Sequence, residues 1–342
     1  MKNLITKMST QAFVIMVTII LFIIMYAAGC VVYADKNFTN IQVFFNLFIS
    51  NAGLIIISAS MTMVMISGGI DISVGSQVAL VCMMMCDLVM NKHVPTAAAI
   101  AICIVYGIVY GIYAGVMVAY LNIQPFIVGL SGMFFARGMT AVINTGMLSI
   151  ADKTFDVLAK TKIMIPIDFL AKVNKRGMKI YPNLYPSVII AFLVLVIMFV
   201  MLKYTKFGRA IYAIGGNEQS ALLMGLNVKK TKFLVYLLDG AIVALGSVVY
   251  CMNTCGGFVA QAQGLEMDAI AAAVIGGTSL MGGVGNVFGT LLGVMTKATI
   301  EALVSFQGSL SSWWAKIIIA TLLAFFIILQ SIITRIKAKA RD

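Results

Sequence analysis

The stretch Ser67–Ser76 reads Ser-Gly-Gly-Ile-Asp-Ile-Ser-Val-Gly-Ser and lies between two long apolar runs. Its glycines allow the backbone to turn where a membrane helix would otherwise continue, so the stretch predicts a break in such a helix. Its aspartate is an ionisable group at membrane depth, where charge is costly. We therefore expect Gly68, Gly69, Asp71 and Gly75 to lie at a helix break beside a translocation path. Asp71 either gates this break or caps the N-terminus of the helix that follows.

The composition around this stretch is that of a membrane protein. The chain has 342 residues, of which 61% are hydrophobic and 11% are charged, whereas soluble domains are about a quarter charged. We predict an all-α, polytopic transmembrane bundle that forms one integral-membrane domain over residues 1–342 and lies in the lipid bilayer. About ten crossings are expected, of which 267–281 is the shortest, at residues 11–33, 41–66, 73–90, 96–120, 126–146, 187–202, 233–252, 267–281, 284–305 and 313–334.

The basic residues predict the orientation of the chain and do not indicate nucleic-acid binding. They cluster in two loops, 147–186 and 203–232, and near both ends. Only the run 187–202 separates the two loops, so they face opposite sides of the membrane. The positive-inside rule then decides through the terminal residues, which place both termini and the 203–232 loop in the cytoplasm and the 147–186 loop outside: Lys2, Lys7, Arg335, Lys337, Lys339 and Arg341.

No catalytic constellation is present in the sequence. His93 is the single histidine, the six cysteines lack metal-site spacing, and no Gly-Lys pair of a phosphate-binding loop occurs. We therefore expect a protein that is not an enzyme and needs no metal or cofactor. If ATP drives it, a separate chain hydrolyses the ATP.

Two glycine ladders have the spacing of one helix face. Residues four apart share such a face, and small residues there let two helices approach closely. We expect helix packing at both ladders: Gly107, Gly111 and Gly115 in one helix, and Gly285, Gly289 and Gly293 in another.

A second glycine pair echoes the first. The stretch Gly276-Gly277-Thr278-Ser279-Leu280 resembles Gly68-Gly69-Ile70-Asp71-Ile72. Paired glycine-interrupted segments in two halves of a chain are typical of transporters built from repeats. Gly276, Gly277 and Ser279 are therefore candidates for a second helix break on the pathway.

Other ionisable residues occur within the predicted membrane segments: Arg137, Asp239, Glu266, Asp268 and Glu301. Glu266 and Asp268 open an apolar helix, whose N-terminus favours carboxylates. Arg137 and Glu301 either pair with each other or face an aqueous path. Asp239 has either a functional role or a buried partner.

The 203–232 loop contains a predicted short helix between Gly215 and Gly225. Asn217 suits its N-cap, Glu218 suits the positive end of the helix dipole, and Gly225 suits its C-terminal stop. Apolar residues nevertheless follow in this loop: Ala221, Leu222, Leu223 and Met224. Such a helix either docks into a groove of a partner protein or lies on the lipid surface.

Together, these segments resemble the permease subunits of sugar-importing ATP-binding-cassette transporters of the ribose, xylose and arabinose type. The likeness rests on Ser67–Ser76, Gly215–Gly225 and 265–293, and the stretch Phe306–Trp314 is more particularly similar to a galactofuranose permease. The resemblance implies a vitamin-B12-permease-like fold in the inner (cytoplasmic) membrane and import of a monosaccharide. It also implies that the helix at 217–225 docks into an ATPase subunit, and that the segments 68–75 and 276–285 lie near the pathway.

The implied partners are the ATPase, a second permease subunit that forms a homo- or heterodimer with this one, and an extracytoplasmic sugar-binding protein. The chain departs from the family pattern at Asp239, where relatives usually carry a small neutral residue, and in the unusually basic 147–186 loop, which suits an acidic binding protein. Two alternatives stay open. One is an ion-coupled secondary transporter that uses Asp71, Asp239 and Glu301, and the other is an importer of nucleosides or another small polar solute.

Overall fold

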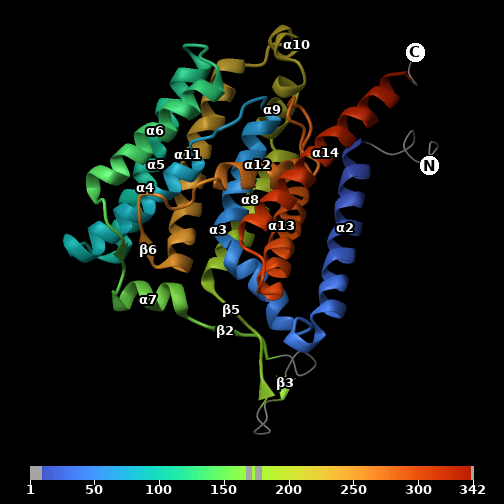
Figure 1. Cartoon of the computed structure of the whole chain (residues 1–342). Coiled ribbons are helices and arrows are strands. Elements are labelled where there is room, and N and C mark those ends of the chain that lie inside the picture. Colours follow the sequence, from blue (N-terminus) through green and yellow to red (C-terminus); the bar gives the residue numbers. More distant parts are fainter. Residues whose placement is uncertain (1–9, 167–171, 174–178, 340–342) are drawn as a thin grey trace.

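The structure, a computed structural model, describes residues 10–166, 172–173 and 179–339. Three of the basic residues named above, Lys2, Lys7 and Arg341, and part of the basic 147–186 loop lie outside this part of the chain. Most of the described residues are helical (Figure 1). The α-helices are α2 (Thr10–Val32), α3 (Ile41–Ile66), α4 (Val74–Cys86), α5 (Thr96–Ala119), α6 (Pro125–Ile143), α7 (Lys153–Lys160), α8 (Pro186–Tyr204), α9 (Lys206–Gly216), α10 (Glu218–Leu223), α11 (Val228–Thr254), α12 (Leu265–Ile275), α13 (Val287–Gln307) and α14 (Trp313–Lys339).

Short elements join these helices. A 3₁₀ turn, Ala34–Lys36, follows α2, and a π-helical turn, Asp87–Asn91, extends α4. Three antiparallel pairs of two-residue strands complete the described part: β1 (Leu148–Ser149) with β6 (Gly256–Gly257), β2 (Ile163–Met164) with β5 (Asn183–Leu184), and β3 (Lys172–Val173) with β4 (Lys179–Ile180).

Nine helical segments in the described residues are long and apolar enough to cross a membrane. The prediction of a polytopic helical membrane protein is therefore confirmed. The expected tenth span at 267–281 is wrong as a continuous membrane helix, because α12 has only 11 residues. Such a helix is about 16 Å long, about half of a bilayer core of about 30 Å.

The chain nevertheless passes from one end of the molecule to the other at this point. β6 pairs with β1 at the end that also holds α7, whereas Gly282 and Gly283 lie against Gly215 and Gly216, next to α10. The tenth passage therefore combines an irregular segment, residues 258–264, with the short helix α12. Figure 1 shows the result: the start of α2 and the end of α14 lie at the α10 end, opposite to α7.

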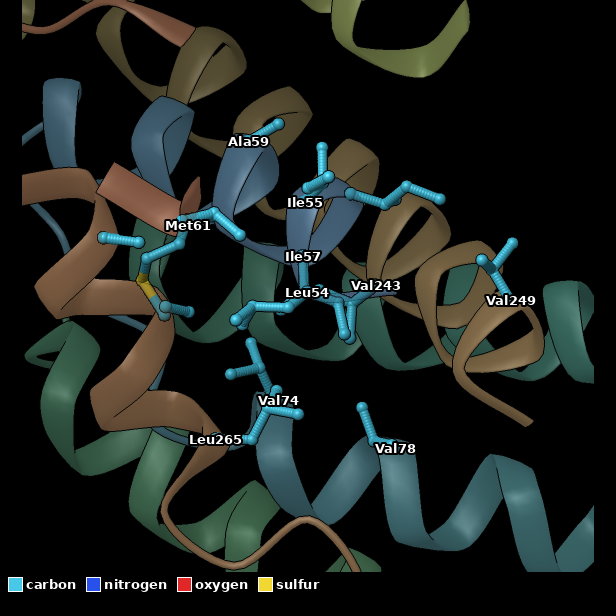
Figure 2. Packing of buried hydrophobic residues seen from close by; sticks show 14 of the residues in the cluster. Leu54, Ile55, Ile57, Ala59, Met61, Val74, Val78, Val243, Val249 and Leu265 are labelled. Carbon is cyan, nitrogen blue, oxygen red and sulfur yellow. The ribbon is translucent and has the colours of Figure 1, made fainter. Parts of the chain in front are cut away.

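The core is organised around α3, whose residues from Asn51 to Ile66 are all buried. A helix that is apolar on all sides belongs inside a bundle, and α3 contacts α11, α13, α8 and α12. Figure 2 shows Leu54 and Ile57 of α3 facing Val74 of α4 and Val243 of α11. In contrast, α2 and α14 are mostly exposed and lie at the outside of the bundle, where lipid would cover them.

The first glycine ladder lies between α5 and α11. A Cβ atom on Gly111 would lie 2.7 Å from the carbonyl oxygen of Tyr236, and Gly107 and Gly115 touch the α11 backbone at Gly240 and Phe233. The two helices are thus in backbone contact along this face, because any larger side chain would push them apart.

The second ladder joins α12 to α13, with one correction. Gly289 touches the backbone of Gly276, and Gly293 touches that of Ala272. Gly285 does not belong to the same helix as the other two, because Asn286 caps α13: its side chain accepts a hydrogen bond from Phe288 N–H at 2.9 Å. Gly285 lies in the preceding loop, against the side chains of Ile66 and Thr278.

Candidate coupling and translocation site

The helix α10 projects from one end of the molecule (Figure 1). Asn217 caps it by accepting a hydrogen bond from Ser220 N–H at 2.8 Å, and Gly225 follows it with a positive φ of 80°. Leu222 and Leu223 expose 62% and 88% of their surface. A capped helix therefore presents apolar side chains away from the rest of the chain.

The inner side of α10 fixes its position. Ala221 is fully buried in a small cluster with Ile214 of α9 and Val228 of α11, so it anchors the helix and offers no surface to a partner. Glu218 forms an ion pair of 2.6 Å with Lys232 on α11. Movement of α10 would thus be transmitted to both α9 and α11.

Three glycine-containing segments meet directly below α10. The N–H of Gly283 donates a hydrogen bond of 2.9 Å to the carbonyl oxygen of Ile66, the last residue of α3. A Cβ atom on Gly282 would lie 2.7 Å from Gly215 O and 3.0 Å from Gly68 Cα. We refer to the segments 66–69, 215–216 and 282–283 as the glycine junction.

The structure places the predicted second break differently from the first. Gly276 packs on Gly289, and Gly277, with a φ of 90°, faces α2. Ser279 accepts a hydrogen bond from Met281 N–H at 3.1 Å within the turn that leads to Gly282. It is therefore Gly282, and not the predicted pair, that touches Gly68. A helix does end at Gly276, as the predicted break requires. The contact of Gly282 with Gly68 was not predicted, because contact across the fold has no local signature in the sequence.

The break after α3 contains Gly68, whose φ is 88°, and ends where α4 begins at Val74. Asp71 is not the N-cap of α4, since Ser73 holds that position. Its Oδ1 nevertheless accepts a hydrogen bond from Ser73 N–H at 2.8 Å. Gly69 lies against the Tyr236 hydroxyl, and Gly75 lies against the Glu266 carboxylate.

Asp71 and Asp239, far apart in the sequence, are brought together. Asp71 is 3% exposed and Asp239 is 1% exposed, and their carboxyl groups are in hydrogen-bonding contact. Asp239 also accepts a hydrogen bond of 2.6 Å from the Ser60 hydroxyl on α3. Glu301, the third expected ion-coupling residue, is not part of this pair.

Arg137 and Glu301, for which mutual pairing was one expectation, have separate partners. The Arg137 guanidinium donates to Val259 O at 2.6 Å and to Gln261 O at 2.7 Å. Both carbonyls belong to the irregular segment 258–264, whose backbone groups have no helical partners and need donors at membrane depth. Arg137 thus supports the one passage that is not made by a long helix.

Glu301 instead pairs with Lys297, a residue that the sequence analysis did not single out. Lys297 lies halfway along α13, is 6% exposed, and contacts Glu301 at 2.8 Å and Asp268 at 3.4 Å. The available signal was a lysine in the middle of an apolar run. Glu266 and Asp268 do lie in the first turn of α12, as expected.

Two cavities open at the α10 end. One, of about 350 Å³, is mostly polar and lies between the break and the start of α11. Its lining includes Gly68, Gly69, Gln124, Glu218, Lys232 and Tyr236. The other, of about 400 Å³, is lined by residues of α2, α8, α9 and the start of α13. Within the described residues, no group of histidine, cysteine and acidic side chains could hold a metal ion.

Comparison with known proteins identifies the family. The family model described as "Branched-chain amino acid transport system / permease component" matches residues 43–327. The chain is 35% identical over 316 residues to the inner membrane ABC transporter permease protein YjfF of Escherichia coli K12, covering 92% of this chain and 91% of that one.

Two further relatives carry a sugar in their names. The fructose import permease protein FruG of Bifidobacterium longum is 34% identical, with 95% and 92% of the two chains covered. The ribose import permease protein RbsC of Escherichia coli K12 is 32% identical, with 87% and 88% covered. No solved structure matches. The family model covers most of the bundle, including the break, α10 and the glycine junction, so the chain belongs to this family of transport-system permease components and is a transport subunit.

Proposed function

We propose that this chain is the permease subunit of an ATP-driven importer that moves a monosaccharide delivered by an extracytoplasmic binding protein. It works with an ATPase subunit and with a second permease, identical or related. The family and the names of its relatives support this role. The α10 end then faces the cytoplasm, together with both termini.

The observation that carries the coupling role is the exposed apolar tip of α10. Leu222, Leu223 and Met224 project from a short helix that is capped at its start and anchored by Ala221. Exposed apolar side chains on an anchored helix suit a groove in a partner protein. The glycine junction connects this helix to the break after α3, so a force on α10 reaches the membrane core through backbone contacts.

The test is to measure copurification of the ATPase and ATP-dependent uptake in vesicles for Leu223→Ser. We expect the ATPase to be lost and uptake to fall at least tenfold, while the variant still inserts and folds. Val157→Ser is the matched control, because Val157 is 67% exposed on α7 at the opposite end. Normal uptake by Leu223→Ser would contradict the coupling role, and uptake without ATP would favour an ion-coupled transporter.

The cargo is proposed as a monosaccharide, including a furanose such as galactofuranose. The 350 Å³ polar cavity between the break and the start of α11 is within the size range of small-molecule sites. Another relative, 29% identical, is named as an autoinducer 2 import permease, so a non-sugar small polar solute is the second candidate. Competition of labelled uptake by monosaccharides and by nucleosides distinguishes the two: we expect a monosaccharide to compete at much lower concentration.

A further inference from the structure

Two acidic side chains in contact inside a membrane protein need an explanation. Asp71 lies at the break after α3, and Asp239 lies on α11, in the middle of a 27-residue helix. Both are at least 97% buried. In the described part of the chain, no ion pair brings a lysine, arginine or histidine to either carboxyl group.

The groups that face the pair are neutral hydrogen-bonding groups. Ser60 of α3 donates to Asp239, and the Ser73 N–H donates to Asp71. On the α6 side, a Cβ atom at Gly129 would lie 3.1 Å from Asp71 Oδ1, so no side chain fits there. The titratable groups around the pair are phenols: Tyr106 and Tyr110 of α5 and Tyr236 of α11. From α12, Glu266 reaches Gly75 near the start of α4.

A hydrogen bond between two carboxyl groups requires one proton, since two carboxylates have only acceptors. Two ionised carboxylates in contact repel each other, and burial increases that cost. The closed cavity beside the pair, lined by Asp71, Gln77, Tyr106 and Tyr110, has no volume that a water molecule can occupy. This cavity therefore offers no room for a water or hydrated cation beside Asp71. A proton shared between two carboxyl groups in contact needs no cavity.

We propose that Asp71 and Asp239 bind one shared proton and form a proton site in the membrane core of this permease. This inference does not depend on the identity of the cargo or on the ATPase.

The surroundings of the pair are suited to proton exchange with the α10 end. Tyr236 lines the 350 Å³ cavity and lies within electrostatic reach of both carboxyl groups. Its hydroxyl is buried and has no hydrogen-bond partner, and the Gln77 side-chain amide nitrogen is likewise buried without one. These two groups are available to a carboxylate once the proton leaves. Tyr236 is thus positioned between the cavity and the pair.

The shared proton links the break after α3, which contains Asp71, to α11, which contains Asp239. The same helix contacts α10 through the ion pair between Lys232 and Glu218. Loss of the proton leaves two like charges in contact and favours their separation. Protonation of the pair therefore stabilises the arrangement of the break that this structure shows.

The direct test is infrared spectroscopy of the purified full chain in lipid nanodiscs at neutral pH. We expect the carbonyl stretch of a protonated carboxylic acid, shifted in deuterium oxide, in the wild type. Asp71→Asn and Asp239→Asn should each abolish this band, because an amide donates the hydrogen bond without a bound proton. Asp152→Asn is the control, because Asp152 is the N-cap of α7, away from the pair, and this variant should keep the band.

A second measurement is the pH dependence of stability in the same samples. The folded wild type holds a proton that the unfolded chain releases, so raising the pH destabilises the wild type more steeply than Asp239→Asn, by up to about tenfold in the folding constant per pH unit. A wild type without the acid band, a band that survives in either asparagine variant, or equal pH slopes would overturn the proposal. None of these readouts involves sugar or ATP, so failure of the proposed function would leave them unchanged.

Discussion

At the scale of single residues, the charged side chains at membrane depth have structural tasks that their positions explain. Arg137 donates hydrogen bonds to two backbone carbonyls, and Lys297 forms ion pairs with two carboxylates. Asp71 and Asp239 contact each other. The sequence marked most of these residues as unusual but did not reveal their partners. Each partner comes from a different helix or segment, and no local pattern records that distance.

Arg137→Met should destabilise the protein by about 2 kcal/mol or more, because hydrogen bonds to charged groups are worth about 1.5–3 kcal/mol each. The substitution leaves the carbonyl oxygens of Val259 and Gln261 without their donor. Thermal unfolding in detergent measures the effect. Arg209→Met is the control, since exposed Arg209 makes one long hydrogen bond of 3.4 Å to Tyr204. Equal unfolding midpoints for the two variants would contradict the role of Arg137.

Lys297→Met should cost about 1.5–3 kcal/mol, the range for hydrogen bonds to charged groups, because the two carboxylates left behind are partly exposed. The loss leaves Asp268 and Glu301 without their cation. Adding Asp268→Asn to Lys297→Met should recover part of the stability, because one unpaired charge is then removed. Chemical denaturation of the single and double variants measures this, and a double variant less stable than Lys297→Met would argue against the pairing.

At the scale of elements, most spans were predictable and the contacts between them were not. The predicted run 41–66 coincides with α3, and the ladder at Gly107 lies on α5 as expected. The irregular passage at 258–264 was missed because Gln261, Gln263 and Gly264 are typical of a surface loop. The register of α12 on α13 was also hidden: Gly276 meets Gly289, Ala272 meets Gly293, and Asp268 meets Lys297. The ion pair between Asp268 and Lys297 thus continues the same four-residue register along the two helices.

Attachment of the surface helix α7 should depend on the ionised form of Asp152. This carboxylate accepts hydrogen bonds from Phe155 N–H at 2.9 Å and from the Thr96 hydroxyl at 3.0 Å, and these bonds lower the pKa of Asp152. Because the folded pKa lies below the ordinary value of about 4, the stabilisation is present at neutral pH. It is lost as the pH falls through the lowered pKa.

The corresponding measurement is hydrogen–deuterium exchange of the α7 amides at neutral pH. Asp152→Ala should exchange severalfold faster, as expected when a helix loses its N-cap, and Asp152→Asn should be intermediate. Unchanged exchange in the alanine variant would show that Asp152 does not hold α7. Val157→Ala is the control within the same helix, because the Val157 side chain is 67% exposed.

At the scale of the whole molecule, the arrangement predicts opposite accessibility for its two ends. Leu223→Cys on α10 and Val157→Cys on α7 both replace strongly exposed residues, at 88% and 67%. In intact cells, a membrane-impermeant thiol reagent should label Val157→Cys at least tenfold faster than Leu223→Cys. The difference should vanish in opened membranes, and the reverse order in intact cells would invert the proposed orientation. Wild-type chain, with its native cysteines, gives the background.

The irregular passage at 258–264 also changes the number of membrane crossings from odd to even. Counting only the nine long apolar segments gives an odd number, which would put the two ends of the polypeptide in different compartments. The passage of 258–264 with α12 restores an even number. We therefore expect fluorescent or enzymatic tags fused to the two termini to report the same compartment. A tag placed between α11 and α12 reports the other one, although a hydropathy plot alone would assign the C-terminal tag incorrectly.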